Sequence, residues 1–343
     1  MAPATVREQL EERERRTLRP HAMLVSNSKG RLRPEPEHEY RTAFQRDRDR
    51  ILHTKAFRRL KHKTQVFLAP EGDHYRTRLT HTLEVSQIAR SVGRALMLNE
   101  DLIEAIALGH DLGHTPFGHA GEAVLNEVYE PGFLHYEQSL RVVDKLEATR
   151  HGRGLNLTFE VRDGILHHSK GKSILLGRES EHASTLEGDV VSVSDAIAYI
   201  NHDIDDAIRA GVIFMSDLPQ AAVRQLGATP SERINTMVVG LIKGSSESAI
   251  GMEREALEAT NELRAYMYNT VYPCEAIGRE IAKAKKLLRE LYFHLLEHPA
   301  DGSDDGDPSD SLERRTVDFV AGMTDQFALQ LYQRIFLPST GRP

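Results

Sequence analysis

Apolar residues recur at every third or fourth position through most of this chain, and strict alternation of apolar and polar residues is rare. Between residues 77 and 97, for example, Val85, Ile88 and Val92 follow one another at spacings of three and four. Residues at these spacings lie on one face of an α-helix, whereas a half-buried strand would alternate. The pattern therefore predicts an all-α fold.

The same periodicity places the individual elements. Helices are expected at residues 4–18, 46–67, 77–97, 99–110, 190–210, 231–243, 252–269, 275–297 and 312–336. Thr115 and Pro116 are residue types that begin a helix, as N-cap and first helical residue, so another helix is expected from there. A short extended stretch is expected at 156–161, and an acidic linker rich in Asp, Gly, Ser and Pro at about 298–311.

Two histidines fall on the apolar faces of predicted helices. His81 stands four residues before Val85, and His110 stands four residues after Ile106. An inward-facing histidine is often only a hydrogen-bonded core residue. Two inward histidines on consecutive helices can instead meet and bind a divalent metal, so both interpretations remain open at this point. His167 and His168 are expected to face solvent or to lie in a loop.

A third buried polar position lies on the helix predicted at 190–210. One face of this helix is apolar throughout, and Gly211 is a residue type that ends a helix. Asp195 lies on another face among small residues, so it is either a paired core acid or a metal ligand. Tyr199 and Asp203 follow Asp195 in steps of four, and all three can therefore line one cavity.

Composition narrows the class of protein. The chain has 343 residues, 40% of them hydrophobic, which is enough to bury a large core. The single Cys274 excludes a disulfide framework and a thiolate metal site, and it agrees with a reducing cytosol. No apolar run approaches the length of a membrane span and no signal peptide is evident, so we expect a soluble, cytoplasmic protein without a membrane partner.

Charge is distributed unevenly behind the net value of −7. Residues 1–65 hold 17 Lys and Arg against 9 Asp and Glu, whereas residues 66–343 hold 27 against 42. A basic segment beside an acidic body suggests a site for phosphate-rich ligands, although a salt-bridged helix surface has the same composition.

Four blocks of sequence combine these features in a fixed order. They are Arg59-Leu60-Lys61-His62-Lys63-Thr64-Gln65-Val66-Phe67, Arg78-Leu79-Thr80-His81, His110-Asp111-Leu112-Gly113-His114-Thr115-Pro116-Phe117-Gly118-His119 and Asp195-Ala196-Ile197-Ala198-Tyr199. Together they resemble the deoxyguanosinetriphosphate triphosphohydrolase-like family of HD-domain phosphohydrolases. We accordingly expect an HD-domain helical bundle with additional N- and C-terminal helices. The segments would be a basic one at 1–65, a metal-binding and catalytic core at 66–211, and a helical C-terminal region at 212–343.

The resemblance implies a role for each matched residue, and these roles fall into three groups. The implied metal ligands are His81, His110, Asp111 and Asp195. The implied catalytic residues are His119, which would act on the 5′-oxygen leaving group, Glu122, which would support His119, and His135, which would line the phosphate site. The implied substrate-binding residues are Arg78 for the phosphates, and Gln65, Tyr199 and Asp203 around the sugar. The metal is a divalent ion, and the ligand types do not distinguish among Mg, Mn, Fe, Ni, Co and Zn.

The implied reaction is hydrolysis of a deoxynucleoside triphosphate at the α-phosphorus to a deoxynucleoside and triphosphate. The alternative is an HD phosphohydrolase or nuclease that acts on another nucleotide or on a DNA-end phosphoester. A third hypothesis is a non-catalytic nucleotide or single-stranded DNA binder that uses the basic N-terminal segment, and the full ligand set argues against it. The family precedent also suggests a homo-oligomer, a tetramer or a hexamer. The preferred base and any activating nucleotide cannot be inferred from these residues.

Overall fold

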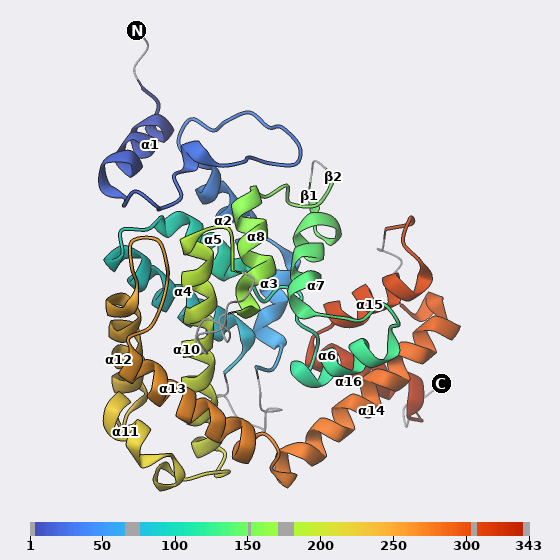
Figure 1. The fold of residues 1–343 in the computed structure, drawn as a ribbon. Coiled ribbons are helices and arrows are strands. Elements are labelled where there is room, and N and C mark those ends of the chain that lie inside the picture. The colour runs from blue at the N-terminus through green and yellow to red at the C-terminus, as the bar shows by residue number, and fades with distance from the viewer. Residues whose placement is uncertain (1–3, 66–75, 150–151, 171–181, 303–306, 339–343) are drawn as a thin grey trace. The chain divides into compact units, whose positions relative to one another are not determined.

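The computed structural model describes residues 4–65, 76–149, 152–170, 182–302 and 307–338 (Figure 1). Within these ranges the chain is built from helices. The named strands there are the two-residue β1 (Ala148–Thr149) and β2 (Gly152–Arg153), which pair antiparallel. The all-α prediction is confirmed. Among the described residues, no helix is long and apolar enough to cross a membrane.

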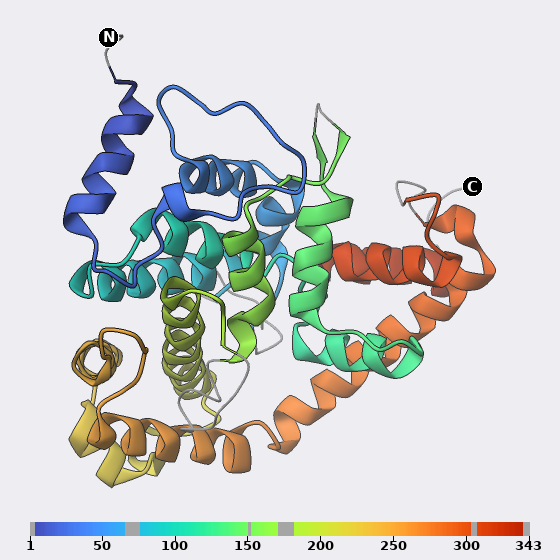
Figure 2. The same ribbon diagram turned by 45° about the horizontal axis from the view of Figure 1, so that its top comes forward.

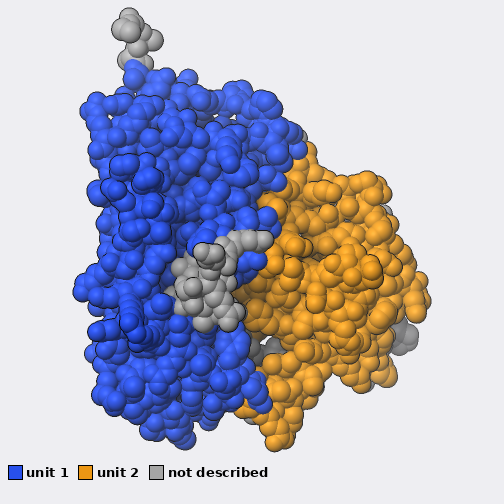
Figure 3. All heavy atoms as spheres, viewed as in Figure 1, with its two compact units in different colours: residues 1–54, 81–110, 155–273 blue, residues 55–80, 111–154, 274–343 orange. Residues whose placement is uncertain are grey.

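Contacts within the chain define two compact units (Figure 3). The first unit comprises residues 1–54, 81–110 and 155–273, and the second comprises residues 55–80, 111–154 and 274–343. Each unit is assembled from three separate stretches of sequence. The three-segment division expected from the sequence stays a prediction.

In the first unit, the 24-residue helix α10 (Leu186–Arg209) contacts α5, α8 and α12 (Figures 1 and 2). Its apolar face is buried as predicted, with Val193, Ile197 and Ile204 fully inaccessible to solvent. The helix begins four residues earlier than expected, because the Thr185 side chain accepts a hydrogen bond from the N–H of Gly188 and caps it. This helix therefore supplies a rigid, buried support for Asp195.

The first unit contains several further helices. They are α1 (Val6–Thr17), α2 (Ala43–Leu52), α5 (Glu100–Gly109), α8 (Phe159–His167), α11 (Gln220–Leu226), α12 (Pro230–Gly244) and α13 (Arg254–Tyr266). The helix α4 (Arg78–Ala95) belongs to this unit from His81 onward. Its apolar stripe of Val85, Ile88 and Val92 is buried, as the spacing predicts.

The second unit is organised around α14 (Glu275–Glu297), which contacts α6, α15 and α16. The other helices of this unit are α3 (Lys55–Arg59), α6 (His119–Val128), α7 (His135–Arg141), α15 (Leu312–Gly322) and α16 (Asp325–Phe336). One apolar cluster joins α6, α14, α15 and α16, and it includes the buried Leu288 and Leu291 of α14 and Val317 of α15. Burying a leucine or valine side chain of this kind contributes roughly 1.5–3 kcal/mol to the stability of the folded state.

Three predicted elements differ in the structure. The expected helix at 312–336 is two helices, because Thr324 accepts a hydrogen bond from the N–H of Phe327 and starts a new helix. The expected helix at 46–67 is interrupted after Leu52, resumes as α3, and continues beyond Arg59 as a single 3-10 turn. Its last two residues lie outside the described ranges. The expected extended stretch at 156–161 becomes helical from Phe159 onward.

Candidate metal and phosphate site

Three predicted metal ligands meet in the first unit: His81 on α4, His110 at the end of α5 and Asp195 on α10. One donor atom from each lies within 4.8 Å of the others. His81 Nε2 is 2.9 Å and His110 Nε2 is 3.8 Å from Asp195 Oδ1. Both histidine side chains are buried, whereas the Asp195 side chain keeps 22% of its surface exposed. The packing of these helices thus brings two imidazoles and a carboxylate together.

The tautomer of His110 suits a metal ligand. Its Nδ1 lies 2.6 Å from the backbone oxygen of Ala107, an arrangement in which Nδ1 carries the proton and donates it. The lone pair on Nε2 then faces Asp195. A buried imidazole beside a carboxylate is the donor chemistry that divalent transition metals accept. These residues therefore fit a divalent cation.

Asp111 follows His110 directly in the chain but belongs to the second unit. Its carboxylate accepts a hydrogen bond from Arg78 Nη1 at 2.9 Å and lies 3.1 Å from His114 Nε2. The side chain is only 4% exposed, so the pairing with the Arg78 guanidinium compensates the charge. The role of Asp111 as a fourth metal ligand stays a prediction.

Glu122 joins two of the predicted catalytic histidines in the second unit. Its carboxylate lies 3.1 Å from Nδ1 of His119 and 2.8 Å from Nδ1 of His135, and it also accepts the backbone N–H of His135 at 2.9 Å. Burial opposes the charged form, but the hydrogen bonds from His119 and His135 hold the pKa of Glu122 well below its ordinary value. The carboxylate therefore stays ionised and orients both rings.

A third histidine, His114, completes this cluster, and the sequence assigned it no role. Its ring stacks on that of His135 with centroids 4.0 Å apart and planes at 17°. Burial, with the positive charge of Arg78 next, holds the pKa of His114 well below its ordinary value. His114 is therefore a neutral hydrogen-bonding group at neutral pH. Its nearness to His110 in the sequence was visible, but nothing there indicated that it would stack.

Arg78 and Gln65 also lie together in the second unit. Arg78 is 1% exposed, and its Nη2 donates to the backbone oxygen of Gln65 at 3.3 Å. Among the described residues, neither Nε of Arg78 nor Oε1 of Gln65 has a hydrogen-bond partner, although both atoms are buried. Buried polar groups are almost always satisfied, so two unpaired atoms on neighbouring residues suit a polar ligand. Gly118 permits the approach, since its φ is +58° and an added Cβ would lie 3.1 Å from Arg78 Nη2.

The predicted sugar-binding residues of α10 have a neighbour that the sequence did not indicate. In the first unit, the Tyr272 hydroxyl donates a hydrogen bond to Asp203 Oδ2. Burial raises the pKa of Tyr272 above its ordinary value, and Asp203 raises it further, so the hydroxyl stays protonated. Tyr199 lies one turn before Asp203 on α10. No local pattern marks Tyr272, because its meeting with α10 depends on tertiary packing alone. Gln65 lies in the other unit.

Two local predictions about histidines and helix starts are wrong. His168 is 1% exposed, and its ring centroid lies 4.9 Å from that of His110, so it does not face solvent. The helix expected from Thr115 begins at His119 instead, with Gly118 as its N-cap. The Thr115 hydroxyl donates to the Gly118 oxygen within this turn and does not cap a helix.

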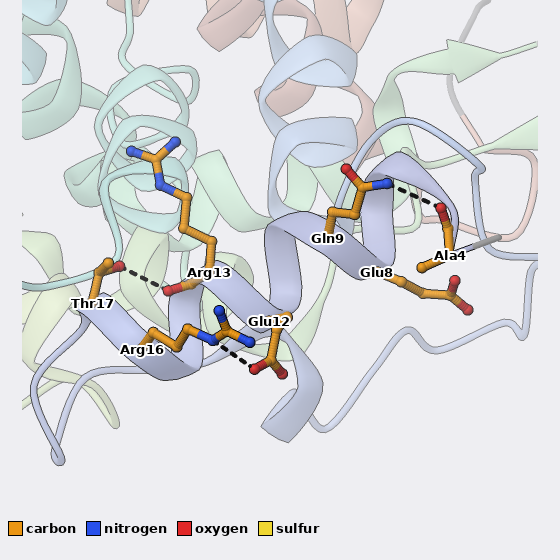
Figure 4. Close-up of a pocket in the computed structure, with 7 residues that line it drawn as sticks. All are labelled: Ala4, Glu8, Gln9, Glu12, Arg13, Arg16 and Thr17. Atoms are coloured by element: carbon orange, nitrogen blue, oxygen red, sulfur yellow. Dashed lines mark hydrogen bonds and ion pairs between the residues drawn. The ribbon is translucent and has the colours of Figure 1, made fainter.

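A hollow of about 390 Å³ on α1 carries no comparable chemistry (Figure 4). It is lined only by residues of the N-terminal stretch from Ala4 to Thr17. Its lining residues hydrogen-bond to one another: the Gln9 side chain donates to the backbone oxygen of Ala4, and Arg16 donates to the Glu12 carboxylate (Figure 4). An exposed ion pair within one helix, such as that of Arg16 and Glu12, contributes little to the free energy of unfolding.

The chain was compared with known proteins. The family model "HD domain" matches residues 78–200, and the model "Phosphohydrolase-associated domain" matches residues 250–334. A deoxyguanosinetriphosphate triphosphohydrolase-like protein of Caldanaerobacter subterraneus subsp. tengcongensis is 52% identical and covers 97% of this chain and 96% of its own. A protein of the same description from Desulfatibacillum aliphaticivorans is 50% identical and covers 98% of this chain and 99% of its own.

A solved structure, that of a hypothetical protein from Aquifex aeolicus, is 19% identical with a TM-score of 0.46, covering 84% of this chain and 71% of that one. The HD-domain match spans the three candidate ligands that the first unit brings together, His81, His110 and Asp195. The four sequence blocks pointed to the same family. The chain belongs to the deoxyguanosinetriphosphate triphosphohydrolase-like family and carries the HD domain of a phosphohydrolase.

Proposed function

We propose that this protein hydrolyses deoxynucleoside triphosphates at the α-phosphorus, releasing a deoxynucleoside and intact triphosphate. The observation that carries the proposal is the buried Arg78, with an unsatisfied Nε, in one compact unit with three histidines. A guanidinium offers several fixed donors to phosphate oxygens, and histidines can move protons near neutral pH. The names of the relatives support the same substrate class.

A divalent metal would be held by His81, His110 and Asp195, with Asp111 as the fourth ligand proposed from the sequence. When bound, such an ion polarises a phosphoryl oxygen and makes water a better nucleophile. Mg, Mn, Fe, Ni, Co and Zn all accept this mixture of nitrogen and oxygen ligands, so the donor set leaves the metal open.

His119 is proposed as the residue that delivers a proton to the 5′-oxygen of the leaving deoxynucleoside. Its ring is half exposed and therefore accessible, and Glu122 binds Nδ1, which leaves Nε2 to face a substrate. Glu122 therefore holds the ring in one orientation, and histidine is the residue type that most often transfers a proton in catalysis. His135, bound to the same carboxylate, would line the phosphate site.

Gln65, Tyr199 and Asp203 are proposed to surround the sugar, with Gln65 and Asp203 near its 3′-hydroxyl. Asp203 already accepts a hydrogen bond from Tyr272, so its carboxylate is oriented before any ligand binds. Oε1 of Gln65 is a buried acceptor without a partner among the described residues. Both features suit a hydroxyl-bearing ligand.

The decisive experiment is product analysis. The protein would be incubated with each deoxynucleoside triphosphate and Mg²⁺ or Mn²⁺, and deoxynucleoside and triphosphate would be separated by chromatography. Ribonucleoside triphosphates, nucleoside monophosphates and a DNA 3′-phosphate would test the alternative phosphoester substrates in parallel, and His81→Ala is the inactive control. Release of diphosphate or orthophosphate in place of triphosphate would contradict cleavage of the bond between the α-phosphorus and the 5′-oxygen.

We also propose two partners. The first is a second copy of the chain, in a tetramer or hexamer, which light scattering at micromolar concentration would test.

The second proposed partner is single-stranded DNA at the basic N-terminal segment. Lys55, Arg58 and Lys61 are exposed, and no ion pair involves them within the described residues. Binding of an oligonucleotide should weaken steeply as salt rises. Unchanged affinity in a Lys55→Ala, Arg58→Ala, Lys61→Ala triple variant would exclude this surface.

A further inference from the structure

His202 is a buried histidine of α10 to which the proposed reaction assigns no role. It is 3% exposed, and its Nδ1 lies 3.3 Å from Nδ1 of His81, with the two ring planes nearly perpendicular at 83°. On its other side, Nε2 of His202 lies 2.9 Å from Oε2 of Glu84. Glu84 belongs to α4, and its side chain is 40% exposed. Three residues thus form a row from the protein surface to the candidate metal site.

The order of atoms along this row determines where the protons lie. His81 presents Nε2 toward Asp195, so a cation bound between them would use the lone pair on Nε2 and leave the proton on Nδ1. This proton needs an acceptor, and Nδ1 of His202 is 3.3 Å away. His202 can accept there only when its own proton sits on Nε2, from which it donates to the Glu84 carboxylate. Each hydrogen bond in the row therefore requires the next one.

The two imidazole ligands differ in how they are supported. His110 is held through its Nδ1 by the backbone oxygen of Ala107, one turn earlier on its own chain segment. His81 depends instead on side chains from its own helix and from α10. The backbone oxygen that holds His110 cannot be removed by substitution. The side chains that support His81, those of His202 and Glu84, can be removed. Outer partners of this kind commonly alter metal affinity by 10- to 100-fold.

We propose that His202 and Glu84 are positioning residues that hold His81 in the tautomer and orientation required to bind a divalent cation. Glu84 fixes the proton of His202 on Nε2, and His202 then accepts the Nδ1 proton of His81. This inference rests on the proposed cation site but not on the proposed reaction. It is therefore tested through metal binding, which can succeed or fail independently of triphosphate release.

The experiment compares two pairs of variants by Co²⁺ affinity, measured against a competing chelator, and by the visible absorption spectrum of bound Co²⁺. His202→Leu removes the acceptor, whereas His202→Asn places Oδ1 close to the position of Nδ1 and can accept the same proton. Glu84→Ala and Glu84→Gln form the second pair, because the glutamine oxygen can still accept from His202. Gln87→Ala, an exposed change one turn further along α4, is the matched control.

We expect His202→Leu to weaken Co²⁺ binding by about 10- to 100-fold and to change the spectrum. His202→Asn should restore most of the affinity, and Glu84→Ala should lose more than Glu84→Gln, which should resemble the control. Equal affinity and spectra across all variants would overturn the proposal. So would an equal loss in His202→Asn and His202→Leu, since His202 would then act otherwise than as an acceptor. If His202→Leu fails to fold, the Glu84 pair decides, because that side chain is largely at the surface.

The proposed reaction and the positioning role of His202 and Glu84 can be refuted separately. A wild-type protein that binds Co²⁺ with the expected differences among variants, yet releases no triphosphate, would refute the proposed reaction and support the positioning role. A wild-type protein that binds no divalent cation would overturn the positioning role together with the cation site.

Discussion

The carboxylate of Asp325 accepts a hydrogen bond from the backbone N–H of Phe117 at 2.9 Å, although the two residues are 208 positions apart. Its second oxygen accepts the N–H of Thr64 at 2.8 Å. Phe117 has a φ of +58° and stands two residues before His119, so the turn that presents His119 is held in an unfavourable conformation by a distant residue. The C-terminal helices therefore support the histidine cluster of the second unit.

Lys63 makes a second connection of this kind. Its Nζ donates hydrogen bonds to the backbone oxygens of His114 and Ala321. Burial lowers the pKa of Lys63 to about 7, while Asp325 opposes the change. The region matched by the phosphohydrolase-associated model is thus bonded directly to the turn between His114 and His119.

We predict that Asp325→Ala lowers both stability and turnover. Two backbone N–H groups would lose their acceptor, which costs about 1–3 kcal/mol of unfolding free energy for a buried group. The His119 turn would also relax, and triphosphate release should fall by more than the loss of folded protein explains. Urea unfolding and product analysis on the same samples measure the two effects. Gln326→Ala, at the exposed neighbouring position, is the control; equal turnover in both variants would remove Asp325 from this role.

Glu14 should make stability depend on pH. Burial is the main reason why its pKa is raised to about 7 from an ordinary value of 4.5, although its carboxylate accepts hydrogen bonds from Val25 and Asn99. Between pH 4.5 and 7 the folded protein then binds more protons at this site than the unfolded chain does. Its contribution to the unfolding free energy is therefore fully present below pH 4.5 and is lost as the pH rises through 7.

Glu14→Gln should remove this dependence. After discounting for partial exposure, wild type relative to the variant should lose about 1–2 kcal/mol of unfolding free energy between pH 4.5 and 8. Urea titrations at several pH values measure the difference. Glu12→Gln is the control on the same helix, since hydrogen bonds from Arg15 and Arg16 lower the pKa of Glu12 and give a dependence of opposite sign. A parallel pH profile for wild type and Glu14→Gln would contradict the assignment.

Helical periodicity predicted the direction of the donor side chains. His81 and His110 continue the apolar faces of α4 and α5, whereas Asp195 lies on a different face of α10 from its apolar stripe, so the 3.6-residue repeat indicates which way each side chain points. The packing of α5 and α10 then brings the side chains together. Position along one helix is local information, and this part of the site is therefore readable from sequence.

The remaining contacts depend on information that no local pattern contains. His168 looks like a surface histidine beside His167, but α8 packs against both α5 and α10 and carries it inside. Tyr272 reaches Asp203 across 69 positions, and Asp325 reaches Phe117 across 208. The start of α6 was misplaced because Phe117 and Gly118 both adopt positive φ, which Thr115 and Pro116 gave no reason to expect.

Metal content should show whether Asp111 binds the same ion as the three candidate ligands of the first unit, His81, His110 and Asp195. Asp195→Ala should lose most of the bound metal, because the carboxylate contacts both imidazoles. Asp111→Asn is the sharper test of the fourth ligand, since its oxygen can still accept the hydrogen bond from buried Arg78 and the fold should survive. Elemental analysis of purified proteins measures both. Metal content equal to wild type in Asp111→Asn would argue against metal coordination that requires the Asp111 charge.

His119→Ala should separate chemistry from structure. The His119 side chain is 51% exposed, and Glu122, to which it hydrogen-bonds, keeps its bonds to His135, so we expect a change in unfolding free energy within about 0.5 kcal/mol. Metal content should equal that of wild type, because His119 belongs to none of the groups of possible metal donors among the described residues. Loss of a general acid typically lowers the rate by about 100- to 10,000-fold.

Gln at position 119 would be the companion variant, because it keeps a hydrogen-bonding side chain but cannot deliver a proton at neutral pH. If His119 acts as the acid, His119→Gln should be as slow as His119→Ala while binding substrate more tightly. Melting temperature, metal content and triphosphate release would be measured on all three proteins. Restored turnover in His119→Gln would mean that the ring only positions the substrate, and near-normal turnover in His119→Ala would exclude it from the reaction.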